Sequence, residues 1–234
     1  MTRPVGFFDS GIGGTCILEA FRRLCPDEET IYIADTAHCP YGNRSPDEII
    51  RLSEACVRRL LRRHCKMIVV ACNTATAAAI DTLRARHPRI PFIGIEPALK
   101  PAALRSRTGV VGVLATAGTF NGRLYNETKA RFARNVTVLA TVADEFVTIV
   151  ERAVIPGRLA VDPARLNTPA VERVVRTKIE PLLRAGADRI VLGCTHFPHL
   201  RPVIESVCAG RAEVIDPAEA VARQARRVLQ AKGL

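Results

Sequence analysis

The sequence predicts an α/β fold of two pseudo-symmetric lobes, each built on a parallel sheet, with the active site in the cleft between the lobes. Runs of β-branched residues alternate with amphipathic helical patterns along the 234 residues, which is typical of parallel sheets. Two of these runs, residues 68–70 and 189–192, each lead through one small residue to a cysteine followed by polar residues. Because ligands bind beyond the carboxyl ends of parallel strands, we expect both cysteines at the site.

The first half of the chain contains four predicted strands separated by helices. The strands are expected at residues 5–8, 31–34, 68–70 and 90–95. A glycine-rich turn at residues 11–14 precedes a helix that ends near Phe21, and a capping box beginning at Ser45 starts another helix. These alternating elements predict one parallel sheet with helices packed on it.

The second half repeats this plan, which indicates duplication. Its strands are expected at residues 109–115, 136–140 and 189–192. The Pro-bounded turn after Glu96 is a predicted crossover to the second lobe, and the Asp216-Pro217 turn mirrors it before a last amphipathic helix. We expect the first lobe to comprise residues 1–97 and 209–234, and the second lobe to comprise residues 98–208.

Composition excludes several classes of protein. A hydrophobic content of 48% with no Trp indicates a globular α/β protein, and eight cysteines without a C-x-x-C pair argue against a structural zinc site. The sequence shows no charged-then-apolar leader and no apolar run of the roughly twenty residues that span a bilayer. We expect a cytoplasmic protein with reduced thiols, no membrane contact and no metal site.

The formal net charge of +11 is compatible with nucleic-acid binding, because basic surfaces attract phosphates. Pairs such as Arg58-Arg59 and Arg62-Arg63, however, fall on the polar faces of predicted helices without interleaved aromatic residues. Nucleic acid is therefore not the expected partner. A positive field also attracts small anionic substrates.

The glycine-rich turn after the first strand suggests an anion site, but only weakly. Cys16 stands where a dinucleotide fingerprint needs its third glycine, although Asp35 mimics the acid that binds a ribose. Asp9 at the mouth of the turn would repel a pyrophosphate, whereas it suits a substrate ammonium. A nucleotide site is therefore not expected.

Most of the cysteines are expected in the core, where a free cysteine usually packs as a small hydrophobe. Cys56, for example, falls on an apolar helical stripe. Cys72 and Cys194 differ because polar residues follow each of them at the end of a strand. Two opposed thiols suit a reaction that removes a proton from one face of a tetrahedral carbon and returns a proton to the other face.

Such a reaction needs one thiolate and one thiol, starting from a free thiol pKa of about 8.5. The residues expected to tune this balance are His196, Asp9 and Asn73. We expect His196 to set the balance between thiol and thiolate at Cys194. Neutral hydroxyl donors that can hold carboxylates, although they are also ordinary helix caps, are Ser10, Thr74, Thr116, Thr119 and Thr195.

Four motifs occur in a specific order along the chain. They are Phe8-Asp9-Ser10-Gly11-Ile12-Gly13-Gly14, Ala34-Asp35-Thr36-Ala37 with Pro40-Tyr41-Gly42, Ala71-Cys72-Asn73-Thr74-Ala75, and Leu192-Gly193-Cys194-Thr195-His196-Phe197-Pro198. With these motifs the sequence resembles the glutamate racemases of the aspartate/glutamate racemase superfamily over nearly its whole length. It departs from many members at residues 142–146, where they carry a Cys-Pro pair.

The resemblance implies interconversion of L- and D-glutamate for peptidoglycan synthesis, without a cofactor or metal, by a protein that is often a homodimer. It implies that Cys72 and Cys194 are the two acid/base catalysts. The residues that it implies for substrate binding are Asp9, Ser10, Tyr41, Gly42, Asn73, Thr74, Thr195 and His196, with Thr116 and Thr119 in a second-lobe loop beside the ligand.

Two alternatives remain open from the sequence. A racemase for aspartate or another acidic compound would carry the same motifs, because they specify the chemistry better than the side-chain pocket. A nucleic-acid-binding protein that has lost catalysis would use the basic surface, but the two intact cysteine motifs argue against it.

Overall fold

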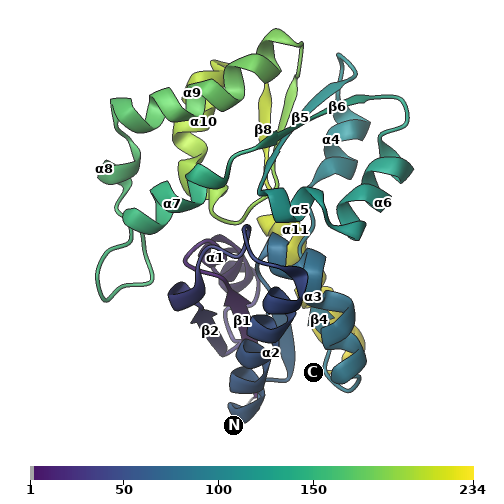
Figure 1. Cartoon of the computed structure of the whole chain (residues 1–234). Helices are drawn as coiled ribbons and strands as arrows, with labels where there is room; N and C mark the ends of the chain where they lie inside the picture. Colours follow the sequence, from purple (N-terminus) through teal and green to yellow (C-terminus); the bar gives the residue numbers. More distant parts are fainter. Residues whose placement is uncertain (1–2) are drawn as a thin grey trace.

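The computed structural model describes residues 3–234 as two lobes, one above the other in Figure 1. Each lobe contains a four-stranded parallel sheet, with strand orders β2-β1-β3-β4 and β6-β5-β7-β8. The matching orders confirm the α/β fold class and the pseudo-symmetric lobes expected from the sequence.

The first lobe carries a short 3-10 turn and four helices around its sheet. Its elements are β1 (Val5–Asp9), α1 (Thr15–Leu24), β2 (Thr30–Ala34), η1 (Thr36–His38), α2 (Pro46–Arg62), β3 (Met67–Val70), α3 (Asn73–Arg86), β4 (Phe92–Ile93) and α11 (Ala218–Lys232). Side chains alternate across the sheet: Phe7 packs with α1 and α11 on one face, and Phe8 packs with α2 and α3 on the other. Both faces of the sheet are therefore covered.

The second lobe is built in the same way. Its elements are α4 (Leu99–Arg105), β5 (Val110–Ala115), α5 (Ala117–Phe120), α6 (Arg123–Phe132), β6 (Thr137–Val142), α7 (Asp144–Arg152), α8 (Pro163–Leu166), α9 (Pro169–Arg184), β7 (Arg189–Leu192), η2 (Phe197–Leu200), α10 (Arg201–Cys208) and β8 (Glu213–Ile215). Helices α7 to α10 pack on one face, where Phe146 and Ile190 are buried, and α4 and α6 pack on the other. Each lobe thus has its own core.

Strand pairing differs from the expected lobe boundary at residue 209. β8 pairs in parallel with β7, Val214 lying opposite Ile190, and Val214 packs in the core of the second lobe. Only α11 then returns to the first lobe, where it packs against α1. The stretch before Asp216 therefore belongs to the sheet of the second lobe and not to that of the first. An edge strand of three residues carries no sequence signal that identifies its partner strand.

The helix boundaries follow local chemistry. The Ser45 side chain accepts a hydrogen bond from the backbone of Glu48, and Pro46 occupies the first turn of α2, as the predicted capping box requires. The fourth strand is shorter than expected, with only Phe92 and Ile93 paired to β3. Within the described residues, no helix combines the length and apolarity needed to cross a bilayer.

We predict that Phe146→Ala lowers the free energy of unfolding by about 3–5 kcal/mol, because a fully buried aromatic ring leaves a cavity. The Phe146 ring packs edge-on against Phe197, with 5.2 Å between ring centroids. Urea denaturation measures the change. Leu104→Ala is the control, since that side chain is 70% exposed and its loss should change stability by less than about 0.5 kcal/mol. Equal losses in the two variants would contradict this packing.

Candidate active site

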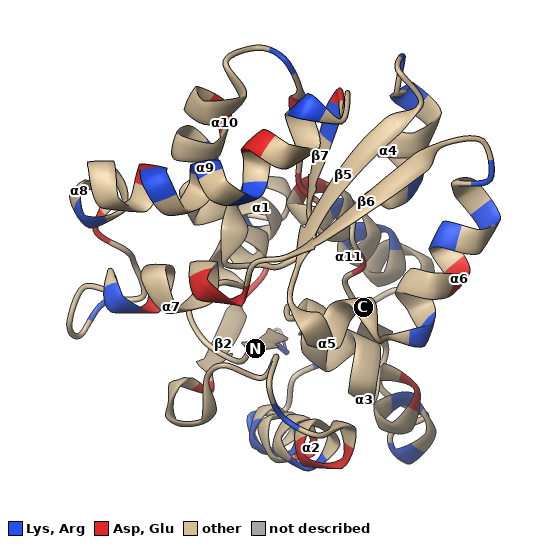
Figure 2. Ribbon diagram, turned by 45° about the horizontal axis from the view of Figure 1, so that its top comes forward, with Lys and Arg blue, Asp and Glu red and all other residues tan. Residues whose placement is uncertain are grey.

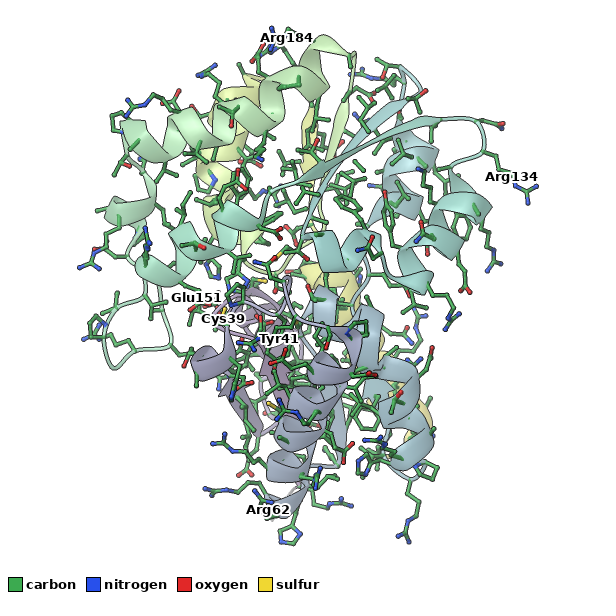
Figure 3. All side chains as sticks on the ribbon, viewed as in Figure 1. Cys39, Tyr41, Arg62, Arg134, Glu151 and Arg184 are labelled. Carbon is green, nitrogen blue, oxygen red and sulfur yellow. The ribbon has the colours of Figure 1, made fainter. Side chains whose placement is uncertain are left out.

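The carboxyl ends of the central strands of both sheets meet at the junction of the lobes. β1 ends at Asp9, β3 leads to Cys72, β5 leads to Thr116 and β7 leads to Cys194. In Figure 3, the labelled Cys39, Tyr41 and Glu151 lie at this junction, whereas the labelled Arg62, Arg134 and Arg184 lie on the periphery. The strand ends are where a parallel sheet positions a ligand.

One small cavity lies between the lobes at these strand ends. Two residues outside the predicted substrate-binding set, Pro40 and Val147, contribute to its wall. The predicted site residues that line it are Ser10, Tyr41, Gly42, Cys72, Asn73, Thr74, Thr116, Cys194, Thr195 and His196. Its volume is about 10 Å³, which is the space of a single water molecule. That space is too small for an amino acid.

Cys72 is held at the first-lobe side of the cavity as the N-cap of α3. Its backbone is extended, and its Sγ accepts from the Ala75 amide at 3.4 Å and lies 3.8 Å from Ser10 Oγ. Burial and the nearby Asp9 carboxylate raise the pKa of the Cys72 thiol well above its usual value. In this closed arrangement Cys72 is a thiol.

Asp9 is a fully buried carboxylate beside Cys72. It accepts hydrogen bonds from the amides of Ser10 and Gly14, each at 2.7 Å, and from Thr195 Oγ1 at 3.2 Å. Burial raises its pKa, although the charge of His196, a hydrogen bond with Cys72 and the Gly14 and Ser10 amides act in the opposite direction. Asp9 therefore lies behind the cavity wall and connects the first lobe to the loop after β7.

Cys194 has a different neighbour at the second-lobe side of the cavity. Its Sγ lies 3.8 Å from Nδ1 of His196, whose Nε2 lies 2.6 Å from Oε1 of Glu151. Burial disfavours the imidazolium, but the contacts with Cys194, Cys39 and Glu151 raise the pKa of His196 well above its usual value. An imidazolium therefore lies beside Cys194 and stabilises negative charge on its sulfur.

Neutral polar groups line the same cavity as the two thiols. Asn73 Nδ2 donates to the carbonyl of Gly193 at 2.9 Å, and within the described chain its buried Oδ1 has no partner. Thr74 Oγ1 lies 2.9 Å from Thr116 Oγ1, which lies 3.1 Å from Thr119 Oγ1. Thr119 thus reaches the cavity only through Thr116.

The loop after η1 forms the remaining wall. The Tyr41 hydroxyl donates to Asp35 at 2.6 Å, so this interaction fixes the ring against the first lobe. A Cβ at Gly42 would lie 3.3 Å from Cβ of Thr116, which is why a larger residue would press against the second lobe there. The whole predicted set is thus assembled around one cavity, with Asp9 and Thr119 just behind its wall.

Glu151 is the residue that sequence reasoning missed. It lies on α7 and accepts from the amide of Ile12 at 2.8 Å while its carboxylate binds His196. Burial raises the pKa of this carboxyl, but the imidazolium and the Ile12 amide lower it more. No motif marks Glu151, and only its position on the helix after β6 links it to the site.

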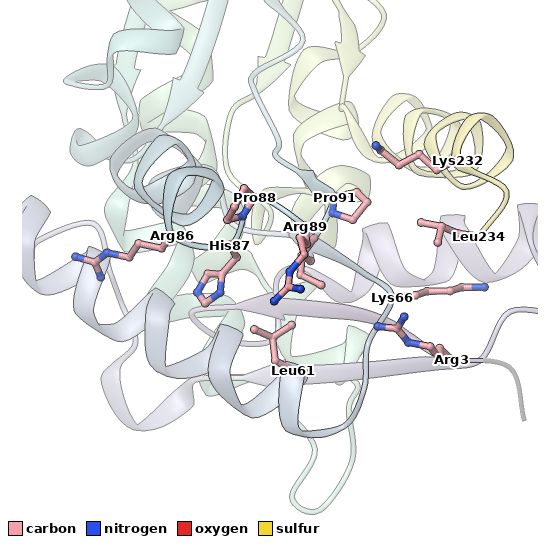
Figure 4. A pocket seen from close by; sticks show the side chains of 11 residues that line it. Arg3, Leu61, Lys66, Arg86, His87, Pro88, Arg89, Pro91, Lys232 and Leu234 are labelled. Carbon is pink, nitrogen blue, oxygen red and sulfur yellow. The ribbon is translucent and has the colours of Figure 1, made fainter.

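A larger cavity, of about 830 Å³, lies in the first lobe at the opposite ends of its strands (Figure 4). Its wall includes the basic residues Arg3, Lys66, Arg86 and Arg89. Because parallel sheets carry ligands at the carboxyl ends of their strands, this cavity is not the candidate active site.

Basic residues are spread over the outer helices and alternate with acidic ones, as α2, α6 and α9 show in Figure 2. Several form ion pairs along one helix, including Arg123 with Glu127 and Arg176 with Glu172. Such mixed, solvated pairs do not form a continuous positive groove of the kind that follows a nucleic-acid backbone.

The protein is thus a two-lobed α/β protein with one thiol from each lobe at the same cleft. This arrangement is suited to proton transfer on both faces of a carbon. The sequence model of the Asp/Glu/hydantoin racemase family matches residues 15–225. The chain therefore belongs to the Asp/Glu/hydantoin racemase family, and the resemblance noted in its four motifs is confirmed.

Its relatives include named glutamate racemases. The chain is 45% identical to glutamate racemase of Roseiflexus sp. over 232 residues, covering 99% of this chain and 81% of the relative. The structure of Escherichia coli glutamate racemase with L-glutamate and the activator UDP-MurNAc-Ala has a TM-score of 0.83 at 34% identity, covering 98% of this chain and 83% of the other. The Francisella tularensis glutamate racemase with D-glutamate has a TM-score of 0.80 at 28% identity, covering 99% and 82%.

We predict that Glu151→Gln lowers the pKa of His196, because an amide cannot stabilise the imidazolium as a carboxylate does. NMR titration of ¹⁵N-labelled histidine measures the midpoint directly. The wild-type protein should hold His196 protonated across neutral pH, and the variant should release the proton at lower pH. His87, which pairs with Glu54 far from the site, is the internal control. An unchanged His196 midpoint would contradict the assigned pair.

Proposed function

We propose that the protein racemises glutamate by a two-base mechanism in which Cys72 and Cys194 exchange protons with opposite faces of the α-carbon. The single observation that carries this proposal is that the two thiols, one from each lobe, line the same cavity. One sulfur removes the α-proton as a thiolate. The other sulfur delivers its own proton to the opposite face, and the configuration inverts.

The two sulfurs have unequal surroundings, and this supports an assignment of the resting charge. Cys72 faces the Asp9 carboxylate, and burial together with that charge raises its pKa. Cys194 faces an imidazolium held by Glu151. The resting enzyme therefore holds Cys72 as the thiol that donates a proton, and one turnover leaves the Cys72 sulfur deprotonated for the reverse reaction.

The neutral donors hold the substrate while the α-carbon carries negative charge. Ser10, Thr74 and Thr195 side chains, with Asn73, offer donors to the two carboxylates, and donors aimed at the carboxylate on the α-carbon stabilise the enolate-like state. Asn73 has a buried oxygen free to accept from the substrate ammonium. Because all proton-transfer groups belong to the chain, we propose that turnover needs neither a metal nor an organic cofactor.

Substrate entry requires the lobes to open, because the closed cavity holds about 10 Å³. We propose that residues 98–215 move as one unit against residues 3–97 with α11. Each unit keeps most of its apolar core during this motion, but Ile12 of the first unit packs in the second-lobe core and has to leave it. The contacts that break are hydrogen bonds such as Thr74 to Thr116 and Asn73 to Gly193, and the substrate replaces them with its own.

The biological setting follows from the reaction. We propose that the D-glutamate supplies peptidoglycan synthesis and that the protein works in the cytoplasm, where its eight free cysteines stay reduced. We also propose a homodimer, as the resemblance to glutamate racemases implies. Gel filtration with light scattering tests the assembly.

The direct test is circular dichroism of L-glutamate and L-aspartate with purified, chelator-treated protein and no added cofactor. The optical signal of L-glutamate should decay to zero, and that of L-aspartate should persist. Decay of aspartate alone would replace the proposed substrate. Stability of both amino acids would refute racemisation and favour a binding protein.

In the same assay, Cys72→Ser and Cys194→Ser should each lower kcat by at least about 10³-fold, because a serine hydroxyl is too weak an acid to serve as the second base. Cys56→Ser is the matched control, since that buried thiol lies in the first-lobe core and its replacement should leave kcat within about twofold. Activity that survives either site substitution would remove that thiol from the mechanism.

A further inference from the structure

A group of three potential ligands lies beside the site and spans the two lobes. The Sγ of Cys39, a carboxylate oxygen of Glu151 and a ring nitrogen of His196 lie within 4.8 Å of one another. Cys39 follows η1 in the first lobe, whereas Glu151 and His196 belong to the second lobe. The proposed proton transfers use neither the Cys39 sulfur nor any ion at this position.

The three ligand types together select zinc. Thiolate, imidazole and carboxylate bind Zn²⁺ at about 2.0–2.3 Å in a tetrahedral arrangement, which separates the ligand atoms by roughly 3.5 Å. The observed spacing needs only a small adjustment to reach that value. Softer ions prefer more sulfur ligands, and Mg²⁺ or Ca²⁺ prefers oxygen ligands alone.

The site has an approach from solvent. Cys39 is partly exposed, and an open cavity of about 260 Å³ borders Cys39 and Glu151 together with Thr36 and Thr148. Water from this cavity supplies the fourth ligand that a site with three protein ligands requires. Arg152 also lines the cavity. Its positive charge repels a metal cation, which lowers the affinity of the site for Zn²⁺ and favours reversible binding.

We propose that Cys39, Glu151 and His196 form a regulatory Zn²⁺ site that holds the two lobes closed and stops turnover. On binding, the Cys39 thiol and the His196 imidazolium each release a proton to solvent, and the metal replaces the hydrogen bond between His196 Nε2 and Glu151. The imidazolium beside Cys194 is lost. The metal also connects the lobes across a cavity too small for an amino acid.

The main competing site for the metal is the pair of thiols inside the cavity, Cys72 and Cys194. Substitution of Cys39 separates the two possibilities, because Cys39 does not line that cavity. Cys39→Ser removes the proposed thiolate ligand, and Cys25→Ser is the matched control, a partly exposed cysteine of the same lobe. Cys25→Ser should retain basal racemase activity within about twofold. Because the Cys39 thiol also contacts His196, the inhibition of each variant by metal is measured against that variant's own metal-free activity.

The first experiment titrates metal-free protein with Co²⁺, which reports tetrahedral thiolate ligation through a near-ultraviolet charge-transfer band, and then with Zn²⁺ to displace it. Wild type and Cys25→Ser should bind one equivalent and show the band. Cys39→Ser should lose the band and bind the metal at least about 10-fold more weakly. Even the loss of a residue that only hydrogen-bonds to a metal ligand lowers affinity by about that much. This readout is independent of enzymatic activity.

The second experiment measures racemisation in buffered free Zn²⁺ without thiol reductants. Wild type and Cys25→Ser should be inhibited, and Cys39→Ser should need at least about 10-fold more Zn²⁺ for the same inhibition.

Zinc should also protect Cys39, but not Cys25, of the wild-type protein from alkylation, which peptide mass spectrometry measures. An unchanged charge-transfer band or unchanged inhibition in Cys39→Ser would assign the metal to Cys72 and Cys194 and overturn the proposal, as would a wild-type protein without a cobalt band.

Discussion

The structure depends on the contact between the carboxyl ends of two parallel sheets. Hydrogen bonds that cross that contact include Ile12 to Glu151 at 2.8 Å, Thr195 to Asp9 at 3.2 Å, Asn73 to Gly193 at 2.9 Å, and Thr74 with Thr116 at 2.9 Å. At about 0.5–1.5 kcal/mol each, such bonds together contribute a few kcal/mol. Together with apolar contacts such as that of Ile12 with the second-lobe core, they align the lobes.

The same contact explains why two chemically identical thiols take unequal roles. Duplication of the lobe gives each sheet a cysteine after its third strand, at Cys72 and Cys194. The lobes then differ in the charge that they bring: a buried carboxylate at Asp9 and an imidazolium at His196. Although the two lobes have similar folds, their opposite charges make the surroundings of the two sulfurs unequal. A pair of one thiol and one thiolate requires such a difference.

Sequence reasoning located the catalytic candidates because their signal is local. A β-branched run followed by a small residue, cysteine and polar residues describes a strand end in one stretch of chain, as at residues 68–74. Glu151 could not be predicted from the sequence, because its partner His196 lies 45 residues away and an acidic residue on a helix usually faces solvent. The pairing of β8 with β7 could not be predicted for a related reason, since the partner of a short edge strand is set by tertiary packing.

The proposed mechanism requires two separate groups that transfer protons on opposite faces of the α-carbon. Its most direct measurement is the isotope content of the first product when L-glutamate is racemised in deuterated water. We predict that D-glutamate carries deuterium at the α-carbon from the earliest turnovers, while the remaining L-glutamate stays protiated. Mass spectrometry after chiral separation measures both. Early D-glutamate that retains the original proton would show that a single group moves the proton between faces, and it would contradict the account.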